Sequence, residues 1–263
     1  MNTPNKKIKK ELTVEQKISR RNFISFGTFG VLAAGAFGGW RWLYNSPLEK
    51  AGITAGARKP LRRVLNSNEA VLRNVVFSEN NLVKTYPKEL AAKHARVNSY
   101  IGIEDEKPFD HETWKLNVIK KGGEVLQIGL DELKTLPKTE IVYDFKCVEG
   151  WDQISHWGGV SFRDFIKHFK LDEYAKMEFV GMETPDRSYY VGLDMPSAMH
   201  PQTLLAYEMS DKPLPLHNGG PLRLIIPVKY GIKNIKRIGS ITFSNTRPRD
   251  YWAEEGYDYY SGL

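Results

Sequence analysis

The sequence IVYDFKCVEGWDQISHW, residues 141–157, contains the only cysteine of this 263-residue chain. Apolar and polar side chains alternate from Ile141 to Lys146, which predicts a strand with one buried face. The Glu149-Gly150-Trp151 segment that follows predicts the end of that strand and the start of a loop. We therefore expect Cys147 where a strand opens into a loop, a position from which a thiolate can face a cavity and bind a soft metal. The alternative is a buried cysteine without chemistry, because free cysteine commonly behaves as a small apolar side chain.

The formal net charge of +7 is concentrated at the N-terminal end of the chain. Residues 1–44 contain eight basic and two acidic side chains, whereas the other 219 residues contain 30 basic and 29 acidic ones. The body of the chain is almost neutral, so we expect no nucleic-acid partner, because binding to nucleic acid needs concentrated positive charge. Hydrophobic residues make up 41% of the chain, which is enough for an ordinary packed core.

Residues 1–44 have the features of a bacterial export signal. The segment Ser19-Arg20-Arg21-Asn22-Phe23-Ile24 follows a basic stretch and leads into an uncharged apolar run that ends at Trp40. This order predicts a twin-arginine signal and a periplasmic location. Ala34-Gly35-Ala36 offers a cleavage site of small residues, but the run is also long enough to remain as a membrane anchor, so both outcomes stay open.

The predicted export affects the interpretation of Cys147. Cysteines of exported proteins normally form disulfides, and a single cysteine cannot pair within its own chain. Proteins that use the twin-arginine route cross the membrane already folded, often with a cofactor inserted. An unpaired thiolate in such a protein favours the interpretation of Cys147 as a cofactor ligand.

The rest of the chain predicts one domain of class α+β. Residues 45–95 are predicted to be a tether that leads into the domain, with a helical stretch from Leu82 to Ala95, and residues 96–263 are predicted to form the domain itself. Many short strands and short helices without regular alternation indicate mixed β-sheets. Residues 212–220 contain too many prolines and glycines for a regular element. The predicted elements are a hairpin over 114–128, helices over 130–136 and from 161, and strands over 176–182, 189–193, 204–209, 221–227 and 238–243.

Catalytic motifs of fixed spacing are absent from the sequence. It contains no His-Glu-x-x-His, no Cys-x-x-Cys and no Gly-x-Ser-x-Gly. A cysteine peptidase that pairs Cys147 with His156 or His200 stays open, because such pairs meet only in the folded chain.

A second polar cluster lies about 70 residues after the cysteine. It consists of His217-Asn218-Gly219-Gly220-Pro221-Leu222-Arg223, Lys229-Tyr230-Gly231 and Lys233-Asn234-Ile235-Lys236. Glycines allow a backbone to approach a ligand closely, and the cations favour an anion such as a phosphate or pyrophosphate. Arg223 lies within an apolar strand, where a guanidinium is expected to need an anion. The alternative is a solvated basic loop beside a core strand.

Together these segments resemble the oxidoreductase molybdopterin-binding domain of the sulfite oxidase fold, and within it the periplasmic protein-methionine-sulfoxide reductases most closely. The resemblance covers about residues 96–260. The matching motifs, in chain order, are KCVEGW (146–151), AMHP (198–201), NGGPLRLIIP (218–227), KYG (229–231) and IK (235–236).

The resemblance implies a molybdenum-molybdopterin cofactor, with Cys147 as the protein ligand to molybdenum. It implies that Glu149 and Lys146 lie near the metal and that Tyr257 takes the position of an aromatic side chain near the site. His200 is either structural or in contact with the pterin. The other residues implied to hold the cofactor are Asn98, Ile101, Gly102, Thr184, Asn218, Arg223, Asn234, Ile235 and Lys236.

The function that the resemblance implies is two-electron oxygen-atom transfer by an exported enzyme. Reduction of an S-oxide, such as methionine sulfoxide in proteins, is the preferred reaction, with a small-molecule or protein-bound substrate. Oxidation of sulfite or another small oxyanion is the alternative reaction. The non-enzyme alternative is an exported binding or assembly module with a buried cysteine. Because the chain shows no second redox centre, a membrane haem protein or another electron-transfer subunit is expected as partner.

The sequence departs from the reductases at three places. Lys146 stands where the reductases have arginine, which keeps the charge but loses the planar guanidinium. Val228 replaces a tryptophan, and the chain stops at Leu263 without their C-terminal extension. These differences leave the substrate open.

Overall fold

This computed structural model contains two five-stranded sheets, which form the framework of the fold. The structure describes residues 13–50, 56–75, 78, 81–93, 95–97, 99–103 and 109–262. By internal contacts the chain divides into a unit made of Met1–Leu48 with Arg58–Leu61 and a unit made of Glu49–Ala57 with Arg62–Leu263. The sheets belong to the second unit.

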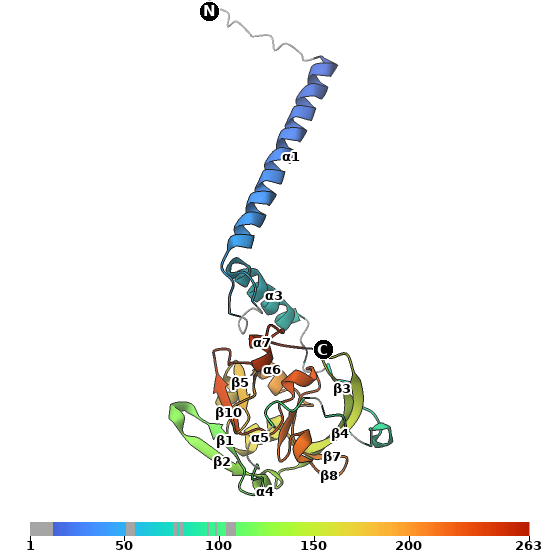
Figure 1. Cartoon of the computed structure of the whole chain (residues 1–263), viewed down its shortest axis with the longest axis vertical. Helices are drawn as coiled ribbons and strands as arrows, with labels where there is room; N and C mark the ends of the chain where they lie inside the picture. The colour runs from blue at the N-terminus through green and yellow to red at the C-terminus, as the bar shows by residue number, and fades with distance from the viewer. Residues whose placement is uncertain are drawn as a thin grey trace, which may run out of the picture. The chain divides into compact units, whose positions relative to one another are not determined.

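The first unit consists mainly of the helix α1 (Val14–Asn45). A capping box starts it: the Gln16 amide donates to Thr13 Oγ1 at 3.3 Å, and the Thr13 amide donates to Gln16 Oε1 at 3.1 Å. None of its residues is buried. Figure 1 shows it as one uninterrupted helix. By length and composition α1 can cross a membrane, a property that it shares with export signals.

The first sheet has the strand order β2-β1-β10-β5-β6. The pair β1 and β10 is parallel, and the other pairs are antiparallel. The strands are β1 (Lys115–Ile119), β2 (Val125–Gly129), β5 (Phe179–Glu183), β6 (Tyr190–Asp194) and β10 (Ser240–Ser244).

The second sheet has the order β3-β4-β7-β8, and β9 also pairs with β7. Figure 1 shows the two sheets on opposite sides of the larger unit. A single core of buried apolar side chains includes residues from both sheets, among them Leu116, Met182 and Val160. The strands are β3 (Lys138–Lys146), β4 (Asp152–Ser161), β7 (Leu204–Met209), β8 (Lys212–Pro213) and β9 (Arg223–Ile225).

Short helices connect the strands. The N-cap predicted at Ser161 is present, since its Oγ accepts a hydrogen bond from the Asp164 amide at 3.0 Å. The mixed sheets and short helices confirm the predicted α+β class. The helices are α3 (Arg62–Val75), α4 (Leu130–Leu133), α5 (Phe162–His168), α6 (Met195–Ala198) and α7 (Tyr251–Glu254), with 3-10 turns at Lys59–Leu61, Lys88–Leu90, Lys121–Gly123, Tyr174–Lys176, Leu216–Asn218 and Gly231–Lys233.

The alternation of apolar and polar residues over 141–146 lies within β3, which confirms the strand predicted there. Ile141, Tyr143 and Phe145 lie in one apolar cluster with Trp157 of β4. The strand β4 was not predicted, because Glu149-Gly150-Trp151 indicated only the end of one strand and the start of a loop. Its glycines explain the difference: a Cβ atom on Gly159 would lie 2.1 Å from the Leu205 carbonyl oxygen, so the tight approach of β4 to β7 requires glycine here.

The helix predicted from Leu82 to Ala95 is wrong. The described part of this segment is mostly extended, with only the turn Lys88–Leu90. The Tyr86 amide donates to the Val142 carbonyl at 2.9 Å, so the segment runs along the edge of β3. The segment pairs with the edge of β3 instead of forming the helix that its local sequence pattern favoured. Pro87, which lies directly before the Lys88–Leu90 turn, also disfavours a continuous helix.

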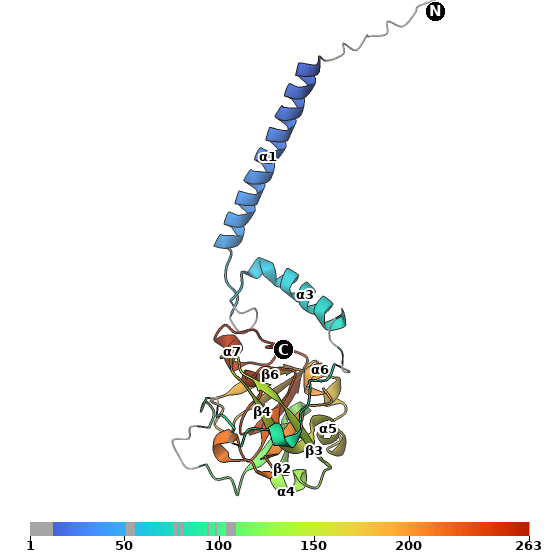
Figure 2. The same cartoon turned by 90° about the vertical axis from the view of Figure 1, so that its right-hand side faces the viewer.

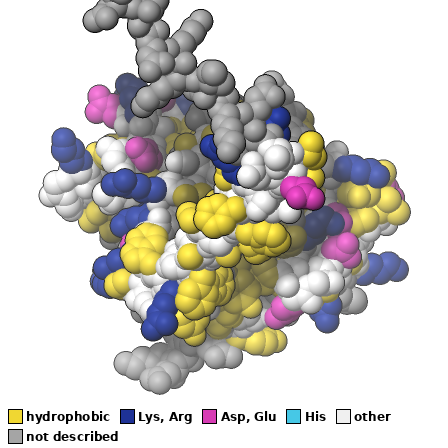
Figure 3. Space-filling view, turned by 90° about the horizontal axis from the view of Figure 1, so that it is seen from above, with side chains coloured by type: hydrophobic (Ala, Val, Ile, Leu, Met, Phe, Trp, Pro, Cys, Tyr) yellow, Lys and Arg dark blue, Asp and Glu magenta, His cyan; other side chains and the backbone are white. Residues whose placement is uncertain are grey.

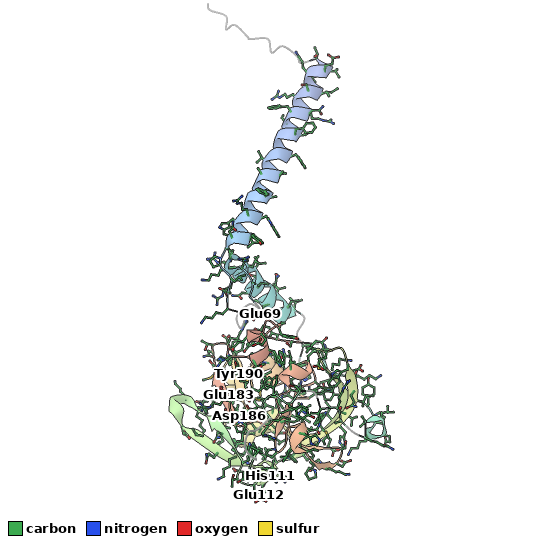
Figure 4. The ribbon with its side chains drawn as sticks, viewed as in Figure 1. Glu69, His111, Glu112, Glu183, Asp186 and Tyr190 are labelled. Atoms are coloured by element: carbon green, nitrogen blue, oxygen red, sulfur yellow. The ribbon has the colours of Figure 1, made fainter. Side chains whose placement is uncertain are left out.

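Two further elements differ from the prediction. Residues 212–220 contain the short strand β8 and the turn Leu216–Asn218, although they were expected to lack regular structure. The helix α3 lies in a segment that was expected to be only a tether (Figure 2). Its Glu69, labelled in Figure 4, accepts hydrogen bonds from Arg247 Nη2 at 2.8 Å and from the Tyr260 hydroxyl, which tie α3 to the C-terminal segment.

Candidate active site

Cys147 lies directly after β3, at the position that the sequence predicted. It starts a tight turn into β4: the Gly150 amide donates to the Cys147 carbonyl at 3.1 Å, and the Cys147 amide donates to the Trp151 carbonyl at 2.9 Å. Gly150 has a φ of 85°, a conformation that favours glycine. Both strands therefore fix the backbone that carries the thiol.

The Cys147 side chain borders a cleft built from five separate parts of the chain. Residues from the 99–101 segment, the 147–149 turn, the 231–236 segment and the C-terminal 252–257 segment meet there, with Tyr189. Six of the residues predicted for the site share this cleft. Its described lining is Ser99, Ile101, Cys147, Val148, Glu149, Tyr189, Gly231, Ile232, Asn234, Lys236, Trp252 and Tyr257.

A second cavity adjoins the first at Cys147 and Val148. Lys146 lines it rather than the cleft, and its Nζ donates to Asp144 Oδ2 at 2.6 Å. Thus Lys146 and Glu149, which flank the cysteine in sequence, project toward different spaces. The described lining of this cavity is Lys146, Cys147, Val148, Gly150, Trp151, Asp152 and Tyr230.

The thiol is largely withdrawn from solvent. Cys147 is 5% exposed. Burial raises the pKa of its thiol above the ordinary value of 9.0, and the neighbouring Glu149 carboxylate acts in the same direction. Glu149 is exposed, and its Oε2 accepts a hydrogen bond from Trp151 Nε1 at 2.8 Å. Without a cation beside it, this thiol stays protonated at neutral pH.

A buried lysine lies across the cleft. Lys236 is 7% exposed, and its Nζ donates to the Ser99 carbonyl at 2.6 Å. Burial, and then the positive charge of Arg223, lowers the pKa of Lys236 to about 7. An anion in the cleft would stabilise the charged form of this lysine.

Arg223 is buried behind the cleft. Its Nη1 donates to the Asn218 carbonyl at 2.7 Å and its Nη2 donates to the Asn234 carbonyl at 3.0 Å. The guanidinium carbon lies 4.7 Å from the centre of the Trp157 ring. Burial lowers the pKa of Arg223 to about 10. The Arg223 guanidinium was expected to need an anion, but carbonyl oxygens and the face of an aromatic ring surround it instead. Its two hydrogen bonds also connect the Asn218 turn to Asn234.

Backbone contacts hold the residues around Lys236 in place. Asn234 Oδ1 accepts from the Ile226 amide at 2.8 Å, and its Nδ2 donates to the Tyr230 carbonyl at 3.0 Å. Ile235 is fully buried in the core. Gly219 has a φ of 107°, and a Cβ atom there would lie 2.8 Å from Lys236 Cβ. The glycine therefore lets the Asn218 turn approach the lysine.

Gly102 and Thr184 pack against each other near the cleft. A Cβ atom on Gly102 would lie 2.8 Å from Thr184 Cγ2. Thr184 Oγ1 donates to Asp186 Oδ1 at 2.5 Å and accepts from the Tyr189 amide at 3.2 Å. Asn98 lies outside the described residues.

His200 does not line the cleft at Cys147. It is 1% exposed, its Nδ1 accepts from the Gln202 amide at 3.3 Å, and it lines a separate cavity together with Asp194 and Lys229. No described histidine lines either cavity beside Cys147. This arrangement does not favour the cysteine peptidase alternative, which needs a histidine at the thiol.

Several residues of the two cavities were not predicted. Ser99, Tyr189 and Trp252, which border the cleft, belong to this group. The aromatic-rich C-terminal sequence around Trp252 could have indicated a site residue there. No local sequence pattern indicates Ser99 or Tyr189, because only the folded chain brings them to the cleft.

The chain matches the family model of the oxidoreductase molybdopterin binding domain over residues 104–252. It belongs to this family. Membership confirms the predicted oxidoreductase class and does not support the alternative of a binding module with an inert cysteine. The α+β fold of mixed sheets is accordingly that of a molybdopterin-binding oxidoreductase domain.

Relatives with curated names agree with this assignment. The chain is 34% identical over 187 residues to a protein of Azospira oryzae provisionally named protein-methionine-sulfoxide reductase subunit YedZ1, covering 71% of the chain and 70% of the relative. It is 31% identical over 224 residues to the protein-methionine-sulfoxide reductase catalytic subunit MsrP of Campylobacter jejuni, covering 76% and 75%. Among solved structures, the sulfane dehydrogenase SoxCD of Paracoccus pantotrophus aligns with a TM-score of 0.48 and 15% identity, over 64% of this chain and 46% of that one.

Proposed function

We propose that this chain is an exported molybdenum-molybdopterin oxidoreductase that reduces S-oxides, with methionine sulfoxide in proteins as the first candidate substrate. The observation that carries the proposal is the cleft in which the chain's single thiol and a buried lysine lie together. Two relatives of similar length, whose names refer to protein-methionine-sulfoxide reductase, support the choice of substrate.

The residues present fit such a cofactor. A metal cation lowers the pKa of a coordinating thiol, and Cys147 is a thiol that burial otherwise keeps protonated. A phosphate beside Lys236 would offset the cost of burying its ammonium group close to Arg223. A metal ion would therefore stabilise the thiolate form of Cys147, and a phosphate would stabilise the charged form of Lys236.

Cys147 would be the protein ligand to molybdenum, and the bound cofactor would supply two-electron redox chemistry at the metal. The pterin and its phosphate would be held by the residues that surround the cleft or pack behind it. We assign this role to Ile101, Gly102, Thr184, Asn218, Arg223, Asn234, Ile235 and Lys236. The sequence resemblance alone adds Asn98, which lies outside the described residues. His200 contributes to the fold rather than to the cofactor in this assignment, because it lines a different cavity.

Substrate reduction also needs protons, because a sulfoxide, two electrons and two protons give a thioether and water. Glu149 and Tyr257 line the same cleft and are both exposed, so their carboxylate and hydroxyl groups can reach a substrate there. Lys146 places a positive charge in the adjoining cavity. These three residues are our candidates for orienting the substrate.

The electrons would come from a membrane haem protein or another electron-transfer subunit. The names of the relatives, each described as a subunit, support such a partner. The apolar helix α1 and the twin arginines before it support export to the periplasm. Retention of α1 would also keep the enzyme at the membrane, next to its electron donor.

Activity assays of the holoenzyme test the proposal. With a reduced dye as electron donor, the wild-type enzyme should reduce methionine sulfoxide, and Cys147→Ala should lose this activity while its circular dichroism spectrum stays the same. Turnover by Cys147→Ala would remove the ligand role of the cysteine. Sulfite oxidation with ferricyanide, in the absence of sulfoxide reduction, would favour the alternative reaction.

A further inference from the structure

We propose that a divalent transition-metal ion, with zinc as the first candidate, binds between Glu140, His156 and Asp211. The site is separate from the cleft at Cys147, and the inference does not rest on the proposed function. Glu140 belongs to β3, His156 to β4, and Asp211 to the turn between β7 and β8. Three segments of the second sheet therefore meet at this point.

The three side chains have the spacing of a ligand set. Each ring nitrogen of His156 lies near a carboxylate, although one ion would bind only a single nitrogen: Nε2 lies 3.8 Å from Glu140 Oε2, and Nδ1 lies 3.9 Å from Asp211 Oδ2. One ligand atom from each residue lies within 4.8 Å of the other two. Zinc bonds to nitrogen and oxygen are about 2.0–2.2 Å long, so tetrahedral ligands are about 3.4 Å apart, and the side chains, whose ligand atoms lie within 4.8 Å of one another, would have to close by about 1 Å.

His156 supplies an independent reason to expect a ligand. Its side chain is 4% exposed, and Nε2 has no hydrogen-bond partner among the described residues. A buried polar atom without a partner is destabilising, and a bond to a metal would satisfy it. Glu140 and Asp211 remain 32% and 59% exposed, so an ion can reach the site from solvent.

A cation already lies between the two carboxylates. Lys88 Nζ is 2.8 Å from Glu140 Oε2 and 3.1 Å from Asp211 Oδ1. Hydrogen bonds to these carboxylates raise the pKa of Lys88 above its ordinary value. Its side chain is 47% exposed, so it can turn into solvent. Lys88 Nζ contacts the two carboxylates but leaves His156 Nε2 without a hydrogen-bond partner among the described residues, whereas a metal ion would bind an imidazole lone pair together with both carboxylates.

The donor set selects the class of ion. Two carboxylates and one neutral imidazole balance the charge of a divalent ion and leave a fourth position for water. Imidazole favours zinc and similar transition metals, whereas magnesium and calcium prefer oxygen ligands alone. Bound here, the ion would join β3, β4 and the β7–β8 turn, a stabilising role at the edge of the sheet.

Zinc titration of the full-length chain without an affinity tag tests the site. All variants carry Cys147→Ala, so that zinc cannot bind at that thiol. Competition with a fluorescent zinc chelator should report one strong site, weakened at least about tenfold by Asp211→Asn and by His156→Gln. Replacement of the exposed His111 by alanine is the matched control and should leave the affinity unchanged.

Lys88→Ala separates a metal site from a simple ion cluster. If Lys88 competes with the metal, removing it should strengthen zinc binding several-fold. Because Lys88 and Asp211 are both exposed, these variants keep the test valid even if His156→Gln fails to fold. Zinc affinity that is unchanged by Asp211→Asn, or that does not increase in Lys88→Ala, would overturn the proposal.

Discussion

Lys236 shows how the fold changes the chemistry of a single residue. Its ordinary pKa of 10.5 falls to about 7 in the fold because of burial and of the charge on Arg223. Between these two values the unfolded chain binds a proton at Lys236 that the folded chain lacks. Folding stability therefore rises as the pH rises from about 7 toward 10.

This rise can be measured by urea unfolding of the cofactor-free protein at pH 7 and pH 9. We expect wild type to gain about 1–2 kcal/mol more over this range than Lys236→Met, which has no proton to release. Replacement of the exposed Lys212 by methionine is the control and should behave as wild type. Equal gains in wild type and Lys236→Met would show that Lys236 does not titrate in this range.

At the residue scale, the sequence predicted several residues that the fold brings into one cleft, but it did not predict their surroundings. Cys147, Glu149, Asn234, Lys236 and Tyr257 meet in one cleft although they come from distant parts of the chain. The depressed pKa of Lys236 could not be predicted, because it depends on the residues that exclude water around it. The carbonyl partners of Arg223 were missed for the same reason.

At the scale of elements, the central strand β4 depends on glycine. A Cβ atom on Gly159 would lie 2.1 Å from the Leu205 carbonyl oxygen and 2.6 Å from Ala206 Cα. The backbone of β7 cannot move away without losing its pairing with β9. We expect Gly159→Ala to destabilise the fold by about 3 kcal/mol or more, measured by chemical unfolding, or to give insoluble protein.

Gly129→Ala is the matched control for Gly159→Ala. Nothing lies within 4 Å of a Cβ atom at Gly129. This substitution should cost less than about 1 kcal/mol. Equal stability of the two variants would contradict the role assigned to the close approach of β4 and β7.

Elements with a clear local pattern were predicted, and those held by distant contacts were not. The hairpin of β1 and β2 and the capped helix α5 carry their signals within their own sequences. By contrast, Glu69 of α3 bonds to Arg247, 178 residues later in the chain. The extended segment at Tyr86 likewise needs the edge of β3 as a partner. Local propensity contains no information on such partners.

At the scale of the whole molecule, the net positive charge is concentrated at the N-terminal end of the sequence. Figure 3 shows Lys and Arg side chains interspersed with Asp and Glu side chains on the face that it presents. This mixture agrees with the near neutrality of residues 45–263, from which we expect no nucleic-acid partner. The basic residues before the apolar part of α1 instead belong to the proposed export signal.

Export can be tested through the twin arginines. Replacing Arg20 and Arg21 together by lysine keeps the charge and the helix but removes the recognition motif, so the chain should stay in the cytoplasm. Cell fractionation and immunoblotting measure the distribution. Replacement of Lys9 and Lys10 by arginine is the control and should leave export intact. Periplasmic delivery of the doubly lysine-substituted chain would contradict a twin-arginine signal.

The molybdenum content of the purified protein tests the central claim most directly. Protein from a host that makes molybdopterin should contain about one molybdenum per chain by mass spectrometry, and Cys147→Ala should lose the activity that depends on this metal. Less than about a tenth of an equivalent in the wild-type protein, with the fold intact, would contradict the assignment of a molybdenum cofactor to this cleft.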